Sequence, residues 1–166
     1  MAAANGGDGD ALAALYLRYR DWVLSLAFRF TGERESAQDV AQEAWLYLLS
    51  KFPGFRLRAR LTTVLYPAVK NTALAMRRKK KPGAAETEVL ELFAAPGVEG
   101  SADRRALVEA VSRLPDGQRE VLIMRAVDEM SLVEIAVALG IPEGTVKSRL
   151  HHAIAALKEG LKGLMD

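Results

Sequence analysis

Cysteine is absent from the 166-residue sequence, which excludes disulfide bonds, thiol catalysis and cysteine-based metal sites. No apolar run approaches the roughly 20 residues that a membrane-spanning helix needs, so membrane insertion is not expected. The first ten residues, MAAANGGDGD, have neither a basic flank nor an apolar stretch and do not resemble a secretory signal. We therefore expect residues 1–9 to be a flexible leader and the protein to be cytoplasmic.

Acidic residues are missing from one long stretch of the chain. Between Phe55 and Lys81 there is no Asp or Glu, whereas nine residues are basic: Arg56, Arg58, Arg60, Lys70, Arg77, Arg78, Lys79, Lys80 and Lys81. A basic block of this kind is an electrostatic footprint for phosphate. A solvated basic surface is an equally common explanation, so charge alone leaves nucleic-acid binding undecided.

Sustained alternation of apolar and polar residues is also lacking, whereas apolar residues recur at helical spacing almost everywhere. The sequence therefore predicts an all-α fold of two small helical domains joined by a flexible linker. In the first domain, residues 10–81, helices are expected from Asp10 to Phe30 and from Ser36 to Lys51, ending at KFPGF. Pro67 disfavours the α conformation at Tyr66, which predicts two helical pieces in the remainder of this domain.

Proline, glycine and acidic residues mark residues 82–102 as the linker, in which TEVLELFA could form one or two helical turns. The second domain, residues 103–166, reads as four helices. Their expected ranges are Asp103 to Leu114, Asp116 to Val127, Leu132 to Leu139, and Glu143 to about Leu161.

The last two of these helices have the dimensions of a DNA-binding helix-turn-helix. Ser131 and Glu134 form the S-x-x-E pattern of a capping box, which defines where the first helix of the pair begins. Gly140 can adopt the left-handed conformation that ends this helix. Pro142 suits the start of the next helix, and Ala136 is small enough for two helices to cross closely.

Winding the final helix at about 100° per residue separates an apolar stripe from a polar one. The apolar stripe is expected in the core and contains Val146, Leu150, Ile154, Leu157 and Leu161. The polar stripe contains Thr145, Ser148, Arg149 and His152, flanked by Lys147 and His151.

This polar stripe lies in the front half of the helix, the part that enters a major groove. Arg149 can read guanine, whereas Lys147 is better placed to hold the phosphate backbone. His151 and His152 point about 100° apart on a helix and so cannot chelate one metal ion well. For any one of these residues a solvated helix surface is the simpler explanation, but together they favour DNA binding.

The string LPDGQREVLIMRAVDEMSLVEIAVALGIPEGTVKSRLHHAIAAL resembles sigma-4, the C-terminal DNA-binding domain of bacterial RNA polymerase sigma factors. Its GTVKSRL segment matches the extracytoplasmic-function (ECF) group. LuxR-type response regulators share a similar helix-turn-helix, but they usually carry a receiver or ligand-binding domain with strands first. This sequence predicts helices there instead.

The stretch ESAQDVAQEAWLYLLSKF resembles the sigma-2 helix that docks on core polymerase. Its inward stripe is expected to contain Val40, Ala44, Leu48 and Phe52. The opposite side carries Asp39, Gln42, Glu43 and Leu46, at i, i+3, i+4, i+7 spacing. Spacing alone favours an ordinary solvated surface, whereas the resemblance implies that these four residues grip the clamp coiled coil of the largest polymerase subunit.

The following segment, TTVLYPAVKNTALAMRRKKK, resembles the part of sigma-2 that opens DNA and captures the minus-ten element. The resemblance implies minus-ten contacts for Lys70, Asn71, Arg77 and Arg78. Capture of a separated strand needs positive charge and a platform or pocket for an unstacked base. Tyr66 and Phe55 are the aromatic candidates for this platform, although core packing is the alternative, and the preferred one for Phe55.

Three positions depart from the family pattern within this segment. Val64 stands where the family usually has Trp, Pro67 replaces a basic or polar residue, and Ala75 occupies a frequent Asp position. Weaker promoter melting or an unusual minus-ten sequence is therefore expected.

The resemblance implies a transcription initiation factor that brings core RNA polymerase to promoters of two parts. The implied partners are the clamp coiled coil and the flap of the large polymerase subunits, promoter DNA and an anti-sigma factor. An independent helix-turn-helix repressor or activator and a sigma-mimicking adaptor remain alternatives. An enzyme is the least expected class, because no catalytic triad, metal cluster or phosphate loop is present, and no cofactor is expected.

Overall fold

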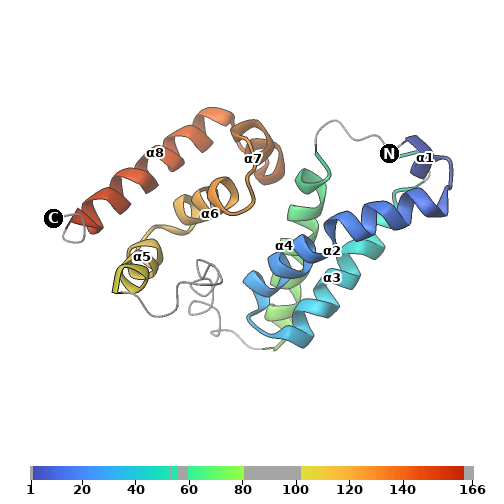
Figure 1. Cartoon of the computed structure of the whole chain (residues 1–166), viewed down its shortest axis with the longest axis horizontal. Helices are drawn as coiled ribbons and strands as arrows, with labels where there is room; N and C mark the ends of the chain where they lie inside the picture. Colours follow the sequence, from blue (N-terminus) through green and yellow to red (C-terminus); the bar gives the residue numbers. More distant parts are fainter. Residues whose placement is uncertain (1, 53, 56–59, 81–101, 163–166) are drawn as a thin grey trace. The chain divides into compact units, whose positions relative to one another are not determined.

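A computed structural model describes residues 2–52, 54–55, 60–80 and 102–162 (Figure 1). Within these ranges the chain consists of helices and the turns between them, without a strand, which confirms the expected all-α fold. The chain divides into two compact units, residues 1–86 and 87–166. The expected linker, including TEVLELFA, lies outside the described residues except for Ala102.

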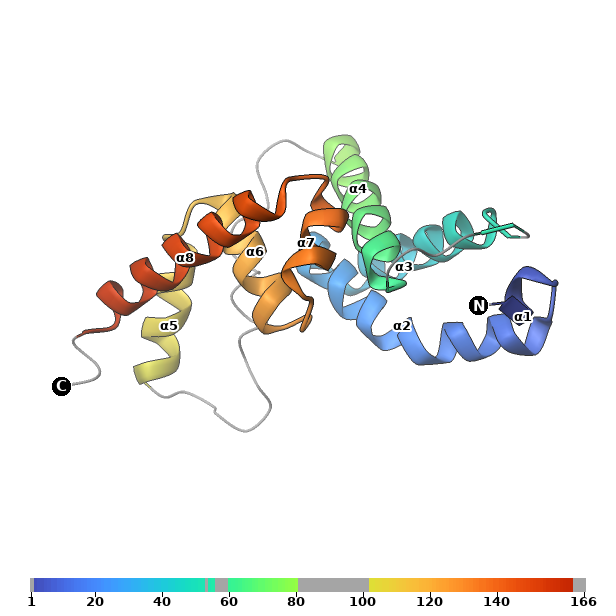
Figure 2. The ribbon, with the colours of Figure 1, turned by 90° about the horizontal axis from the view of Figure 1, so that it is seen from above.

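The first unit contains α1 (Ala2–Asn5), α2 (Gly9–Thr31), α3 (Arg34–Leu49) and α4 (Thr62–Lys80). A tight turn reverses the chain after α2, where Gly32 adopts the left-handed conformation (φ 67°) and donates its N–H to the Phe28 carbonyl. As a result α2 and α3 lie side by side, and α4 packs against both (Figures 1 and 2). Their shared core is made of Val23, Leu26, Ala27, Val40, Ala44, Leu48, Leu65, Val69 and Ala73.

Part of the expected leader, residues 1–9, is helical, because α1 forms within it and packs against α2. Ala4 is completely buried. Asp8 begins α2 as its N-cap, since its carboxylate accepts hydrogen bonds from the backbone N–H groups of Asp10 and Ala11 at 3.0 and 3.2 Å. These local contacts order the chain before the first long helix.

The expected break at Pro67 is also wrong, because Pro67 lies inside the continuous helix α4. Proline there removes one backbone hydrogen bond and costs about 3 kcal/mol in a helix interior. Leu65, Tyr66 and Val69 are nevertheless all at most 3% exposed, and burying each such side chain is worth about 1.5–3 kcal/mol. Tertiary packing on both sides of Pro67 therefore outweighs the local cost.

The second unit contains α5 (Ala102–Ser112), α6 (Asp116–Ala126), α7 (Leu132–Leu139) and α8 (Glu143–Gly160). These helices confirm the four that the sequence predicted. The long helix α8 contacts each of the other three, as both views show (Figures 1 and 2). One cluster of its core joins α5, α6 and α8 through Val111, Leu114, Leu122 and Ala153.

Candidate nucleic-acid and docking interfaces

The corner between α7 and α8 is held by short-range hydrogen bonds. Ser131 Oγ accepts the Glu134 N–H at 3.2 Å, and a Glu134 carboxylate oxygen accepts the Ser131 N–H at 2.7 Å, which completes the predicted capping box. Gly140 has φ 65°, and the next N–H, of Ile141, reaches back to the Ala136 carbonyl at 3.1 Å. Pro142 then stands as the N-cap of α8. The helix-turn-helix geometry expected from the sequence is therefore present.

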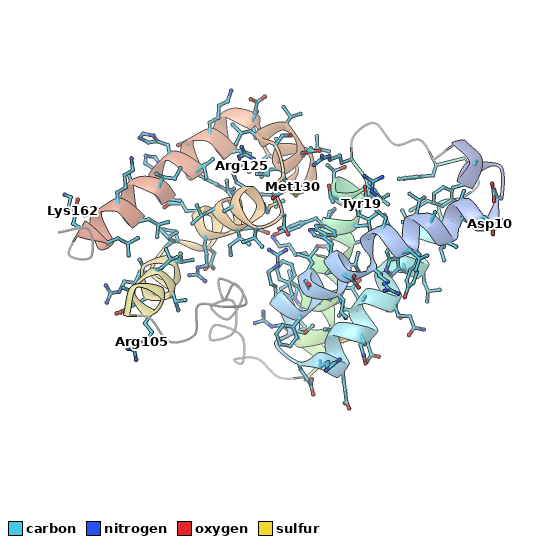
Figure 3. All side chains as sticks on the ribbon, in the orientation of Figure 1. Asp10, Tyr19, Arg105, Arg125, Met130 and Lys162 are labelled. Carbon is cyan, nitrogen blue, oxygen red and sulfur yellow. The ribbon has the colours of Figure 1, made fainter. Side chains whose placement is uncertain are left out.

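Two arginine side chains of α6 connect it to the segments on either side, namely the end of α5 and the turn before α7. Arg119 donates from Nη2 to the carbonyls of Ser112 and Leu114, both at 2.8 Å, and so ties α6 to the end of α5. Arg125 donates to the Met130 carbonyl at 3.3 Å across the turn that leads to α7 (Figure 3). Each bond satisfies a carbonyl at a helix end or in the turn that follows it.

The buried side of α8 differs at one position from the stripe that the sequence predicted. Val146 is fully buried, and Leu150 and Leu157 are partly buried against the core. Ile154, however, is 41% exposed, while Ala153 is completely buried. The residues of α8 that pack against the core are therefore Leu150, Ala153 and Leu157, at i, i+3, i+7 spacing. This is because α5 and α6 cover that side of the helix, and the small Ala153 lets them approach closely.

The polar side of α8 faces solvent in its front half. Lys147, Ser148, His151 and His152 are exposed, and Thr145 and Arg149 are half-buried. Lys147 pairs with Glu143 one turn earlier, with 2.7 Å between Nζ and Oε1. The two histidine rings stand edge to face with their centroids 5.8 Å apart. The five predicted DNA-facing side chains and the flanking His151 therefore share one accessible region of this helix.

Arg149 has a neighbour that the sequence did not reveal. Its guanidinium lies against Gly117 in the first turn of α6: a Cβ added to Gly117 would stand 3.2 Å from its Cζ and Nη1. Helical periodicity places Arg149 on the polar stripe but says nothing of which residue from another helix lies beneath it.

The candidate minus-ten residues lie along the second half of α4. Asn71 and Arg78 are exposed and separated by seven residues, so they share one side of the helix. Lys70 and Arg77 are half-buried and repeat the same spacing on the adjacent side. The basic residues Arg56 and Arg58, and the side chains of Lys79 to Lys81, lie outside the described residues.

Tyr66 does not form the stacking platform that was one possibility for it. It is 3% exposed and packs edge to face against Phe30, with ring centroids 6.0 Å apart. Phe55 is half-buried and lies 5.4 Å from the ring of Phe52, in agreement with the preferred packing role. Tyr66 faces inward because α4 continues through Pro67 and turns this side of the helix toward α2.

The candidate docking residues on α3 are all exposed. Asp39, Gln42 and Glu43 surround Leu46, whose side chain is 55% exposed although it is apolar. The inward stripe of α3 is buried as predicted at Val40, Ala44 and Leu48. Its last member, Phe52, is half-buried beyond the end of the helix.

A groove of about 550 Å³ runs beside these docking residues, between α2 and α3, and Gln42 and Leu46 form part of its wall. The opposite wall comes from α2 and includes Tyr16, Arg20 and Leu24. Tyr16 stacks edge to face on Trp45, with ring centroids 5.1 Å apart. Sequence reasoning missed this α2 wall; Tyr16, Arg20 and Leu24 recur at helical spacing, but only the pairing of α2 with α3 brings them beside Leu46.

The described ranges hold no group of three or more His, Asp or Glu side chains arranged to bind a metal ion. None of the helices described combines the length and the apolar character needed to cross a bilayer.

Comparison with known proteins gives matches for both units. Residues 15–82 match the family model for sigma-70 region 2, and residues 104–157 match that for sigma-70 region 4. The ECF RNA polymerase sigma factor SigW of Bacillus subtilis is 33% identical over 173 residues, covering 95% of this chain and 92% of SigW. The RNA polymerase sigma-E factor of Streptomyces coelicolor is 34% identical over 148 residues, covering 88% of this chain and 84% of that protein.

Two solved structures share the fold. CnrH, in complex with the cytosolic domain of CnrY, has a TM-score of 0.69 at 21% identity and covers 98% of this chain and 94% of its own. The sigma factor RpoE from Bartonella quintana, in complex with the anti-sigma factor NepR, has a TM-score of 0.64 at 23% identity and covers 90% of this chain and 96% of its own. The matches to both sigma-70 family models and to SigW show that the chain belongs to the sigma-70 family of RNA polymerase sigma factors, in its ECF group.

Proposed function

We propose that this protein is a transcription initiation factor, without catalytic chemistry of its own, that binds core RNA polymerase and directs it to specific promoters. In this proposal α8 reads the upstream, minus-thirty-five element as duplex DNA. The second half of α4 contacts the minus-ten element as a separated strand, and the exposed side of α3 docks on polymerase. The observation that carries the proposal is the exposed polar region of α8 directly behind a capped helix-turn-helix corner.

The chemistry of α8 supports duplex reading. A helix-turn-helix presents the front of its second helix to the major groove, where side chains meet base edges. Arg149 is the residue suited to a bidentate contact with guanine, and Thr145, Ser148 and His152 offer shorter hydrogen-bonding groups around it. Lys147 supplies a charge for phosphate once its ion pair with Glu143 opens.

The first unit supports the other two contacts. Lys70, Asn71, Arg77 and Arg78 occupy adjacent sides of one helix, so they can follow the phosphates of one strand. Asp39, Gln42, Glu43 and Leu46 combine negative charge with an exposed apolar side chain, a composition that suits a protein partner and repels DNA. The proposed partner is the clamp coiled coil of the largest subunit.

Further partners follow from the same family membership. CnrH and RpoE were solved in complex with CnrY and the anti-sigma factor NepR, respectively, which supports an anti-sigma factor as a regulator of this chain. We also assign the second unit a contact with the polymerase flap, and the whole protein a cytoplasmic site of action.

The proposal is tested by co-purification with core polymerase followed by run-off transcription from a random-promoter library. We expect polymerase-dependent transcription from a narrow set of promoters with two separated elements. Tight duplex binding by the protein alone, without transcription, would instead establish an independent helix-turn-helix regulator. Capture of an anti-sigma factor without polymerase or promoter binding would establish a sigma-mimicking adaptor.

A further inference from the structure

A glycine in α6 lies directly beneath the guanidinium of Arg149. Gly117 is the second residue of α6, and Arg149 comes from the second turn of α8. A Cβ added to Gly117 would stand 3.2 Å from Cζ, 3.2 Å from Nη1 and 3.4 Å from Nε of Arg149. Three atoms of one planar group at nearly equal distances mean that the plane lies flat over Gly117. Any side chain at this position would meet the guanidinium.

Packing, and not charge, holds Arg149 in this place. The guanidinium lies at the N-terminal end of α6, where the helix dipole is positive and does not attract a cation. The nearby Asp116 carboxylate pairs with Arg119 at 3.5 Å. Within the described part of the chain, the Arg149 side chain makes no hydrogen bond or ion pair, so its donors are available for DNA. Its direction is set by the backbone surface that the missing side chain of Gly117 leaves open.

We propose that Gly117 is a positioning residue that sets how Arg149 reads the promoter. The inference rests on the proposed function, in which Arg149 contacts a base of the upstream element. Bidentate recognition of guanine requires the plane of the guanidinium to align with the base edge. Such a group must be held to within about 0.5 Å to act well. A methyl group at 3.2 Å is tighter than ordinary contact, and Arg149 gives way because its flexible end carries the clash.

The test is Gly117→Ala in the full chain, reconstituted with core polymerase and assayed on a promoter recovered from the random library. Competition between this promoter and its single-base-pair variants measures discrimination at each position of the upstream element. We expect discrimination to fall about threefold to tenfold at the pair that Arg149 reads, and to stay unchanged elsewhere. The melting temperature should hold or rise, because alanine favours a helix more than glycine does.

The matched control is Gly160→Ala, at the other end of α8. A Cβ there would stand 3.5 Å from the Cβ of Ala110, which is ordinary contact. This variant makes the same chemical change in the same unit and should leave discrimination unaltered. A graded effect is expected at position 117, with Gly117→Leu approaching the loss caused by Arg149→Ala.

A double variant separates this inference from the proposed function. In the Arg149→Ala background, Gly117→Ala should cause no further loss of discrimination, because the residue it positions is gone. An equal loss in both backgrounds would overturn the inference, as would unchanged discrimination in Gly117→Ala when Arg149→Ala alone has a clear effect. If Arg149→Ala leaves discrimination intact, the base-reading role of Arg149 fails, and the positioning role of Gly117 fails with it.

Discussion

The two helices that carry the candidate interfaces, α3 and α8, present polar residues at the same helical spacing but in opposite surroundings. On α3, Asp39 and Glu43 lie near a groove of mixed polar and apolar lining whose far wall belongs to α2. On α8, Lys147 and Arg149 stand among small polar and histidine side chains, and α6 places Gly117 against the guanidinium of Arg149. Helical periodicity identifies the polar side of each helix. The charge of its residues and the neighbouring helix distinguish the two surfaces.

This difference between the two surfaces predicts that their binding affinities depend differently on salt. A surface that neutralises phosphates releases counterions, so its affinity falls steeply as salt rises. A surface built around exposed apolar and aromatic groups binds mainly by burying them and depends less on salt. In the proposed function the α8 surface is of the first kind, and the α3 surface with Leu46 and its groove is of the second. Four variants, in order of expected effect, test this contrast.

The largest effect is expected from Asp39→Arg combined with Glu43→Arg. In the proposed complex, the polymerase surface that complements Asp39 and Glu43 would face two arginines instead. The resulting charge repulsion should abolish binding to core polymerase. Helicity measured by circular dichroism should be unchanged, because both side chains are exposed. The matched control is Glu109→Arg with Glu159→Arg, the same charge change on surface ion pairs of the second unit. Polymerase binding retained by the α3 variant would place the docking interface elsewhere.

The next largest effect is expected from Arg149→Ala. Loss of the guanine contact should cost about 1–3 kcal/mol and relax discrimination at one or two base pairs of the upstream element. Competition among single-base-pair variants of a selected promoter measures this loss. A uniform weakening over all sequences would instead show that Arg149 contacts only phosphate.

A smaller effect is expected from Leu46→Ser, which tests the apolar part of the docking surface. Truncating a half-exposed leucine at the wall of the groove should weaken polymerase binding by about 1–2 kcal/mol, with little change in salt dependence. Titration of labelled protein with core polymerase at two salt concentrations measures both quantities. Leu17→Ser is the control, since Leu17 is 59% exposed on α2 and does not line the groove. Equal losses from the two variants would remove the groove from the interface.

The smallest effect is expected from Lys147→Ala. Removing one phosphate contact should weaken promoter binding by the holoenzyme about equally for all sequences and lower the slope of log affinity against log salt by about one. The ion pair with Glu143 is exposed, so its loss should leave the melting temperature nearly unchanged. A change of sequence preference, without a change of salt slope, would make Lys147 a base-reading residue.

Much of the fold and of the candidate sites could be predicted because the signals are local. The capping box of Ser131 and Glu134, the left-handed Gly140 and the burial of Val146 each depend on residues a few positions apart, and the structure shows all three. The inward stripe of α3 follows from its own periodicity in the same way. The accessible positions of the candidate docking and DNA-facing residues are on the other side of these stripes.

The predictions that the structure corrected share one cause, which is contact between elements distant in the sequence. Pro67 is tolerated because Leu65, Tyr66 and Val69 are buried by α2 and α3, and that burial takes Tyr66 out of reach of DNA. Ala153, and not Ile154, faces α5 and α6 because those helices determine which side of α8 is covered. No pattern within one helix contains this information.

Local signals in the chain were enough to establish that this protein is helical, where most of its helices begin and end, and which family it belongs to, because caps, helical periodicity and the GTVKSRL motif each involve residues a few positions apart. Packing between segments was needed to establish that α4 continues through Pro67, that α2 and α3 enclose a groove beside Leu46, and that Arg149 lies flat on Gly117. Each of these depends on burial and steric contact between helices, and such contacts form only when separate segments pack together.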